Sequence, residues 1–241
     1  MIPRILISKA ATPDGGKEIC LYKHDEDYSI TVGNAELMSS RAHGSEEALA
    51  ELACKRIENQ EKPRVLIGGL GMGFTLRAAL DRLPVKAQVV VAELVPAVVR
   101  WNRGPLAGLA GRPLSDKRVS IREADAAEMI QAGPARYNAI MLDVDNGPGA
   151  VTRTDNDWFY SLKGLYAIFA ALRPKGVLAT WSAGPDAAFT ARMNKVGFTV
   201  DEVRVRAHSS GKGGHHIIWI ARKTGSKSKK KINLCRRQNG S

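Results

Sequence analysis

The sequence predicts an α/β protein with a mostly parallel sheet, helices on both faces of that sheet, a closing antiparallel hairpin and a small N-terminal β extension. Three observations support this prediction. From residue 64 onward, short apolar runs alternate with segments of helical periodicity, as in a parallel sheet with crossover helices. The first forty residues carry β-branched and aromatic residues between turn sequences. The last two strand-like runs follow one another with no helical pattern between them.

Each element can be placed along the chain. In the first region, strands are expected at 4–10, 17–24 and 28–33, and a helix with Ser45 as its N-cap at 45–59. Buried strands are then expected at 64–69, 87–94, 118–125, 137–145 and 177–184, and an antiparallel pair at 199–208 and 215–223. The intervening helices are expected at 73–83, 96–104, 126–133, 158–176 and 186–197. The predicted division is a β region at 1–44, an α/β domain at 45–223 and a basic tail at 224–241.

Composition excludes several classes of protein. The 241 residues are 44% hydrophobic and 25% charged, which is typical of a soluble globular domain. No run approaches the roughly 18 to 20 apolar residues that a membrane helix needs, and the N-terminus lacks a signal-peptide pattern. Three scattered cysteines form neither a disulfide framework nor a metal cluster, and the His215-His216 pair has no further ligand at metal spacing. We therefore expect a cytoplasmic protein without a metal site and without a membrane contact.

The net charge of +12 comes mostly from the C-terminal end. Residues 222–241 include eight basic residues and no acidic ones, which leaves about +4 for the rest of the chain. The tail is polar and has no periodic apolar face, so we expect a disordered, solvated segment. The alternative for the tail is a weak contact with nucleic acid.

Candidate functional groups follow the first three buried strands, where open α/β sheets bind their ligands. A glycine loop with Gly69, Gly71 and Gly73 follows the first strand and would let a ligand approach the backbone. Glu93 ends the second strand, at the position of an acid that binds ribose hydroxyls. Asp125 follows the third strand and could accept from an adenine amine. The alternatives are a tight turn for the glycines, an exposed loop acid for Glu93 and a helix N-cap for Asp125.

In this order, the glycine loop and the two acids resemble the Rossmann-like fold of class I S-adenosylmethionine (SAM) methyltransferases. With their flanking sequences, the segments VLIGGLGMGFTLRAAL, VVVAELVPAVVRWNR, DKRVSIREADAAEMI and YNAIMLDVDNGPG resemble the spermidine synthase family of aminopropyltransferases. The similarity covers roughly residues 20 to 223. It implies a small N-terminal β domain, a homodimer and a cofactor that is SAM or decarboxylated SAM.

The resemblance also implies a role for individual residues. Glu93 matches the family's ribose-binding acid and Asp125 its adenine-side acid. Asp143 matches the acid beside the amine nucleophile, and the neighbouring Asp145 could serve as the second acid of that motif, whose own position is Asn146.

Other positions depart from the family pattern. Gly71 stands where the family has an Asp that pairs with the amine of decarboxylated SAM. Met38 replaces a Gln near the end of the β domain. Leu49 and Ala50 replace a Tyr-His pair in the following helix, while Glu51 matches the acid after that pair.

These residues predict a spermidine synthase-like transferase that alkylates an amine-like acceptor. A carboxylate such as Asp143 can position an amine and accept the proton that it must lose before attacking a sulfonium. The alternative role of Asp143 is to cap or structure a loop, and the following segment 146–157 is either a mobile lid or an ordinary loop.

Two other functions remain open at this point. Because Gly71 removes a carboxylate that would repel the carboxylate of intact SAM, the first is methyl transfer. The second is a non-catalytic binding protein that has lost the polyamine pocket.

Overall fold

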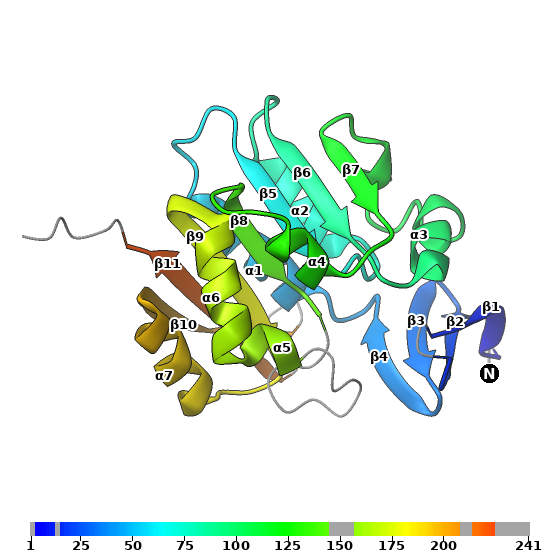
Figure 1. The fold of residues 1–241 in the computed structure, drawn as a ribbon. Coiled ribbons are helices and arrows are strands. Elements are labelled where there is room, and N and C mark those ends of the chain that lie inside the picture. The colour runs from blue at the N-terminus through cyan, green and yellow to red at the C-terminus, as the bar shows by residue number, and fades with distance from the viewer. Residues whose placement is uncertain (1–2, 13–14, 145–156, 208–213, 225–241) are drawn as a thin grey trace, which may run out of the picture.

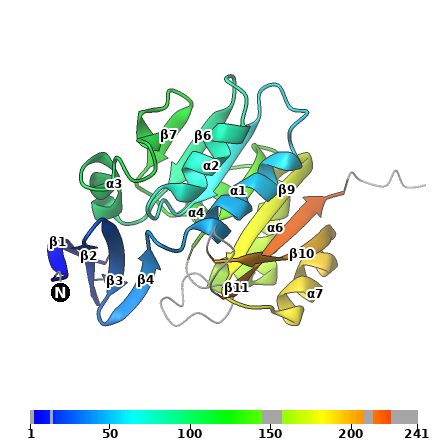
Figure 2. The same cartoon turned by 180° about the vertical axis from the view of Figure 1, so that it is seen from behind.

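The computed structural model describes residues 3–12, 15–144, 157–207 and 214–224, which form a small sheet beside a larger α/β domain (Figures 1 and 2). The strands are β1 (Ile5–Ala11), β2 (Glu18–His24), β3 (Asp27–Val32), β4 (Ala35–Ser39), β5 (Arg64–Gly68), β6 (Gln88–Ala92), β7 (Val119–Arg122), β8 (Tyr137–Leu142), β9 (Leu172–Ser182), β10 (Phe198–Arg206) and β11 (His215–Lys223). The helices are α1 (Gly44–Lys55), α2 (Phe74–Arg82), α3 (Pro96–Arg103), the 3₁₀ turn η1 (Pro113–Ser115), α4 (Ala126–Gln131), α5 (Asp157–Tyr160), α6 (Leu162–Ala171) and α7 (Ala187–Val196).

The small sheet is an antiparallel meander in the order β1-β2-β3-β4. Asp25 and Gly33 adopt positive φ (57° and 56°) in the two tight turns that join β2 to β3 and β3 to β4. The sequence analysis did not anticipate β4, because its AELMS sequence has few β-branched residues and follows the previous strand after only a short turn.

The large sheet has the order β10-β11-β9-β8-β5-β6-β7. Strands β5 to β9 are parallel, and β11 pairs antiparallel with both β9 and β10. The predicted fold class, with a mostly parallel sheet and a closing antiparallel hairpin, is confirmed. Because β5 lies between β6 and β8, strand order reverses beside its C-terminal end, which is where ligands bind in such sheets.

Alternating residues of the strands serve two separate cores. Val65 and Ile67 of β5 pack on the face covered by α1, α2 and α3, whereas Leu66 between them packs on the face covered by α4, α6 and α7. Figure 2 brings α1 and α2 to the front, and Figure 1 shows α4 and α6 on the other side. The continuous apolar sequence of β5 therefore reflects burial of both sheet faces.

The single long helix expected at 158–176 is wrong. The chain forms α5 and α6 separately, because the hydroxyl of Ser161 accepts a hydrogen bond from the N–H of Gly164 (3.0 Å) and begins a new helix. A Cβ on Gly164 would lie 1.9 Å from the carbonyl oxygen of Trp158, so glycine is required at this tight junction. The Pro-Lys-Gly sequence at 174–176 lies within β9, which begins at Leu172 beside Tyr137 and shifts register before Val177.

Ser45 does not cap α1. The N-cap position is His43, which makes no side-chain cap hydrogen bond, and Ser45 lies inside the first turn. Its hydroxyl lies 2.9 Å from the Nδ1 atom of His216 at the start of β11. The first turn of α1 is thereby tied to the end of the large sheet that also carries the candidate site.

Candidate functional site

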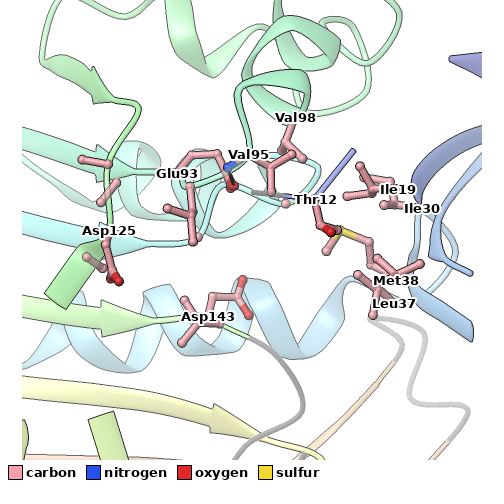
Figure 3. Close-up of a pocket in the computed structure, with 18 of the residues that line it drawn as sticks. Thr12, Ile19, Ile30, Leu37, Met38, Glu93, Val95, Val98, Asp125 and Asp143 are labelled. Atoms are coloured by element: carbon pink, nitrogen blue, oxygen red, sulfur yellow. Dashed lines mark hydrogen bonds between the residues drawn. The ribbon is translucent and has the colours of Figure 1, made fainter. Parts of the chain in front are cut away.

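A cavity of about 170 Å³ opens where the C-terminal ends of β5, β6 and β8 face the small sheet (Figure 3). The predicted residues Gly69, Gly71, Glu93, Asp125 and Asp143 all line it. The opposite wall comes from the small sheet and is mainly apolar, with Ile19, Ile30, Val32, Leu37 and Met38. The structure thus brings five of the seven predicted site residues to one cavity.

The glycine loop after β5 has two different functions. Gly69 and Gly71 have positive φ (88° and 53°) and line the cavity. A Cβ on Gly69 would lie 2.4 Å from the carbonyl oxygen of Asp143, so only glycine allows the loop to pass so close to the end of β8. Gly73 begins α2 with φ of 90° and is absent from the cavity lining; a Cβ there would meet Asn102 (3.1 Å) and Pro113 (3.3 Å). Glycine at position 73 therefore allows the start of α2 to pack closely against α3 and η1.

Glu93 is buried and its carboxylate is fixed by two backbone amides. Oε2 accepts from the N–H of Leu70 (2.9 Å) and Oε1 from the N–H of Val95 (2.8 Å). The side chain is only 7% exposed, which excludes the alternative of an exposed loop acid. A carboxylate oxygen can accept more than one hydrogen bond, so these two amides do not by themselves prevent Glu93 from binding hydroxyl donors in the cavity.

Asp125 lines the cavity and also caps α4. Its Oδ1 accepts from the N–H of Ala127 (2.7 Å), the geometry of an N-cap. The capping role proposed from the sequence is therefore present. It fixes the orientation of the carboxylate and leaves Oδ2 as an acceptor toward the cavity.

Asp143 follows β8 and is held by Thr75 of α2. The Thr75 hydroxyl donates to Oδ2 of Asp143 (2.7 Å), and the Asp143 backbone N–H donates to the carbonyl of Gly68 (3.0 Å). Burial raises the pKa of Asp143, and the hydrogen bond from Thr75 opposes that rise. A carboxylate whose pKa is raised by burial is a better proton acceptor than an exposed one.

A second acid near Asp143 was missed by the sequence analysis. Burial, followed by the negative charges of Asp143 and Glu47, raises the pKa of Glu46 well above its ordinary value. The Thr75 hydroxyl also lies 3.4 Å from the Glu46 carbonyl, which places the first turn of α1 beside the Thr75–Asp143 pair. Glu51, the acid matched by the family pattern, is instead exposed and pairs with Arg82. Only the position of Glu46 in the first turn of a helix before the glycine loop could have indicated it.

Met38 contacts the glycine loop. A Cβ on Gly71 would lie 3.4 Å from the Met38 sulfur, so the thioether covers the position where the family has an acid. Lys17, from the turn before β2, also lines the cavity. Asp145, Asn146 and all but the last residue of the proposed lid at 146–157 lie outside the described residues, as does the basic tail beyond Thr224.

Two general features concern only the described part of the chain. None of the helices there is long and apolar enough to cross a membrane. The same residues contain no cluster of three or more His, Cys, Asp or Glu side chains that could hold a metal ion.

Comparison with known proteins gives relatives in sequence and in fold. No family model matches the chain. It is 28% identical over 138 residues to a polyamine aminopropyltransferase of Korarchaeum cryptofilum and 31% identical over 131 residues to polyamine aminopropyltransferase 2 of Pseudomonas aeruginosa. The alignments cover 57% and 49% of this chain but only 40% and 33% of those relatives. The matched region therefore spans less than half the length of either protein.

The fold is similar to that of spermidine synthase from Thermotoga maritima, with a TM-score of 0.71, 19% identity and coverage of 90% of this chain and 72% of that one. A precorrin-6y C5,15-methyltransferase of Geobacter metallireducens gives a TM-score of 0.52 at 16% identity, covering 72% of this chain and 88% of that one. At such identities the structures establish the fold alone. The predicted resemblance to spermidine synthases and the methyltransferase-like fold are confirmed.

Proposed function

We propose that this chain is a transferase that moves an alkyl group from a sulfonium nucleoside to an amine, with decarboxylated SAM as the donor and a polyamine-related acceptor. The observation that carries the proposal is the cavity, which gathers a glycine loop, the fixed carboxylate of Glu93, the capping acid Asp125 and the buried acid Asp143. Relatives named polyamine aminopropyltransferases support it. So does the fold likeness to a spermidine synthase in complex with a transition state analogue (TM-score 0.69).

The residues present fit an adenosine-containing donor. Positive φ at Gly69 and Gly71 leaves backbone, without Cβ atoms, against the cavity. Glu93 would hold the ribose hydroxyls, and the free oxygen of Asp125 would accept from the adenine amine. When bound, the donor supplies an alkyl group on a positively charged sulfur.

At the acceptor, Asp143 has two functions in this proposal. Its carboxylate orients the amine by accepting an N–H hydrogen bond, and it receives the proton that the ammonium must lose before its nitrogen can form the new C–N bond. The C–S bond breaks, and its electron pair neutralises the sulfur. Thr75 acts as a positioning residue because it fixes one oxygen of Asp143. Asp145 would supply a second acid at this end.

Removing the Thr75 hydroxyl tests that positioning role. Thr75→Val keeps the side-chain shape but removes a hydrogen bond that lowers the pKa of Asp143, so that pKa rises. Asp143 is then ionised only at higher pH. The acid limb of the profile of turnover against pH therefore shifts to higher pH. On the acid side we expect about fivefold lower turnover, which corresponds to a ~1 kcal/mol hydrogen bond.

Two variants control that measurement. Thr75→Ser keeps the donor and should restore the profile of the original chain. Thr180→Val makes the same change at a buried threonine whose hydroxyl has no hydrogen-bond partner in the described structure, and should leave the profile in place. An unmoved acid limb in Thr75→Val would show that Asp143 is not the titrating group.

Methyl transfer from intact SAM is the second candidate function. It is favoured by Gly71 and Met38, which present no carboxylate at the loop, and by Lys17 in the cavity wall, whose charge would attract the carboxylate of intact SAM.

We also propose a homodimer located in the cytoplasm. β1 is an edge strand of the small sheet, and its consecutive residues Ile5, Leu6 and Ile7 are 54%, 47% and 40% exposed. An exposed apolar edge strand favours pairing with a second chain. Sedimentation should therefore give twice the mass of the 26.1 kDa chain, and Leu6→Lys should give the monomer mass. A monomer before substitution would contradict the dimer.

A further inference from the structure

The cavity of the candidate site differs in charge from one end to the other. The three carboxylates in its described lining, those of Glu93, Asp125 and Asp143, all belong to the large domain. The small sheet contributes a surface that we call the apolar wall, which consists of Ile19, Ile30, Val32, Leu37 and Met38. Figure 3 shows Glu93 and Asp125 toward one end of the cavity, the labelled residues of the apolar wall toward the other, and Asp143 between these ends.

Most of the apolar wall is fixed by packing. Ile19 and Ile30 are 4% and 0% exposed and belong to the core that lies between the small sheet and the large domain. Val32 and Met38 pack against the same core. Side chains held in this way cannot move aside to let water or a polar group reach a charge placed against them.

The proposed function determines which part of a ligand lies against this wall. The nucleoside takes the end with Glu93 and Asp125, and the reacting nitrogen of the acceptor lies at Asp143. Beyond Asp143 the described lining is the apolar wall, so the rest of the acceptor lies there. Glu46, the other acid near Asp143, is not among the lining residues. Methylene groups gain affinity at such a surface, roughly fourfold for each one buried, whereas a second ammonium would lose its water and find no acceptor.

Lys17 is a further obstacle to a second ammonium. It lines the cavity from the turn before β2 and is exposed, and its ammonium pairs with no acid in the part of the chain that the structure describes. Its positive charge repels a cation at the apolar wall. The far end of a diamine would therefore meet an apolar surface and a like charge together.

We infer that the acceptor is a primary amine with a single positive charge on an apolar chain, and that the apolar wall selects it against diamines. The inference rests on the proposed function and narrows its acceptor, since a polyamine-related compound qualifies when its second nitrogen is uncharged, as in an N-acylated diamine. The acceptor nitrogen first gives a proton to Asp143, and its lone pair then forms the C–N bond. The electron pair of the breaking C–S bond passes to the sulfur, which leaves a neutral thioether.

Steady-state turnover of pentan-1-amine and of 1,4-diaminobutane tests this inference, because the two amines have the same length and a methyl group in the first replaces the second ammonium of the other. With the donor that binds more tightly, we expect kcat/KM to be at least tenfold higher for pentan-1-amine. A smaller preference, or a preference for 1,4-diaminobutane, would overturn the inference and leave the proposed function in place. Absence of turnover with every amine would overturn the proposed function, and this inference with it.

A charge placed on the apolar wall should reverse the selection. Leu37 on β4 is half-buried and lines the cavity but belongs to neither buried core, so it can be replaced without opening the core. In Leu37→Asp the new carboxylate would pair with a far ammonium, and the ratio of the two kcat/KM values should move at least tenfold toward 1,4-diaminobutane. No movement of the ratio would overturn the inference.

Leu37→Asn is the matched control, because it has the size of Leu37→Asp without the charge. Its ratio should stay within threefold of that of the original chain, and an equal shift in both variants would overturn selection by charge at this wall. Calorimetric donor affinity should be the same for both variants, which shows that each is folded. The comparison of the two amines on the original chain does not depend on either variant.

Discussion

Replacing Asp143 with Asn should lower turnover at least a hundredfold, since general-base groups contribute about 10² to 10⁴ to rate. Asn keeps the shape of the side chain and can still contact Thr75, but it cannot accept a proton from the acceptor ammonium. Donor binding should change little, because Glu93 and the glycine loop hold the other end of the cavity. A coupled assay for the released thioether nucleoside, together with calorimetric donor binding, gives both quantities.

The same variant should be more stable at neutral and alkaline pH. Burial raises the pKa of Asp143 above its unfolded value, so ionisation favours the unfolded state once pH exceeds that unfolded value. Asn removes this cost. The gain in the free energy of unfolding should shrink as pH falls, because Asp143 in the original chain is then already neutral. Greater stability with lost turnover is the signature of a functional buried acid.

Asp81→Asn is the matched control, because Asp81 is an exposed acid that pairs with Arg77. It should affect neither turnover nor the pH dependence of stability. If Asp143→Asn keeps full turnover, Asp143 is only a loop-structuring residue. If the original chain itself binds the donor but shows no turnover with any amine, the non-catalytic alternative is correct.

Replacing Gly71 with Asp should change the preference between the two donors. Gly71 has φ of 53°, a conformation that Asp tolerates better than most residues, and a Cβ would have ordinary room against the flexible Met38 side chain. The new carboxylate would attract the ammonium of decarboxylated SAM and repel the carboxylate of SAM. We expect the affinity for decarboxylated SAM to rise about tenfold and the affinity for SAM to fall about tenfold, which is ~1.4 kcal/mol for each donor.

Gly71→Asn separates charge from shape in this experiment. It adds a side chain of the same size without a negative charge, and should leave the ratio of the two affinities close to that of the original chain. If Gly71→Asp and Gly71→Asn gave the same ratio of affinities for the two donors, the end of the donor that carries its amine would not lie beside this loop.

The parts predicted well from the sequence are those fixed by local pattern. An apolar run that ends in glycine predicts the buried strand at Arg64–Gly68. The position of Glu93 and Asp143 at one cavity was predictable because the carboxyl ends of parallel strands meet at one edge of the sheet. Gly73 shows the limit of such patterns. It belongs to the same glycine loop as Gly69 but does not line the cavity, and a Cβ there would meet Asn102 and Pro113.

The parts missed depend on contacts between distant segments. Glu46 approaches Asp143 only because α1 packs beside α2 and β9, and nothing in the spacing of residues 46 and 143 shows this. Likewise, Ser45 has the composition of an N-cap, yet its hydroxyl faces His216, 171 residues away. At Ser45, tertiary packing overrode the local preference for an N-cap.

Calorimetric titration of decarboxylated SAM and of SAM into the original chain and into Glu93→Gln tests the central claim most directly. We predict binding of at least one donor, and a 10- to 100-fold loss in Glu93→Gln, the range for a charged hydrogen-bond acceptor worth about 1.5 to 3 kcal/mol. Tighter binding of decarboxylated SAM would support aminopropyl transfer, and tighter binding of SAM would support methyl transfer. Failure of the folded original chain to bind either donor, or unchanged affinity in Glu93→Gln, would contradict the account.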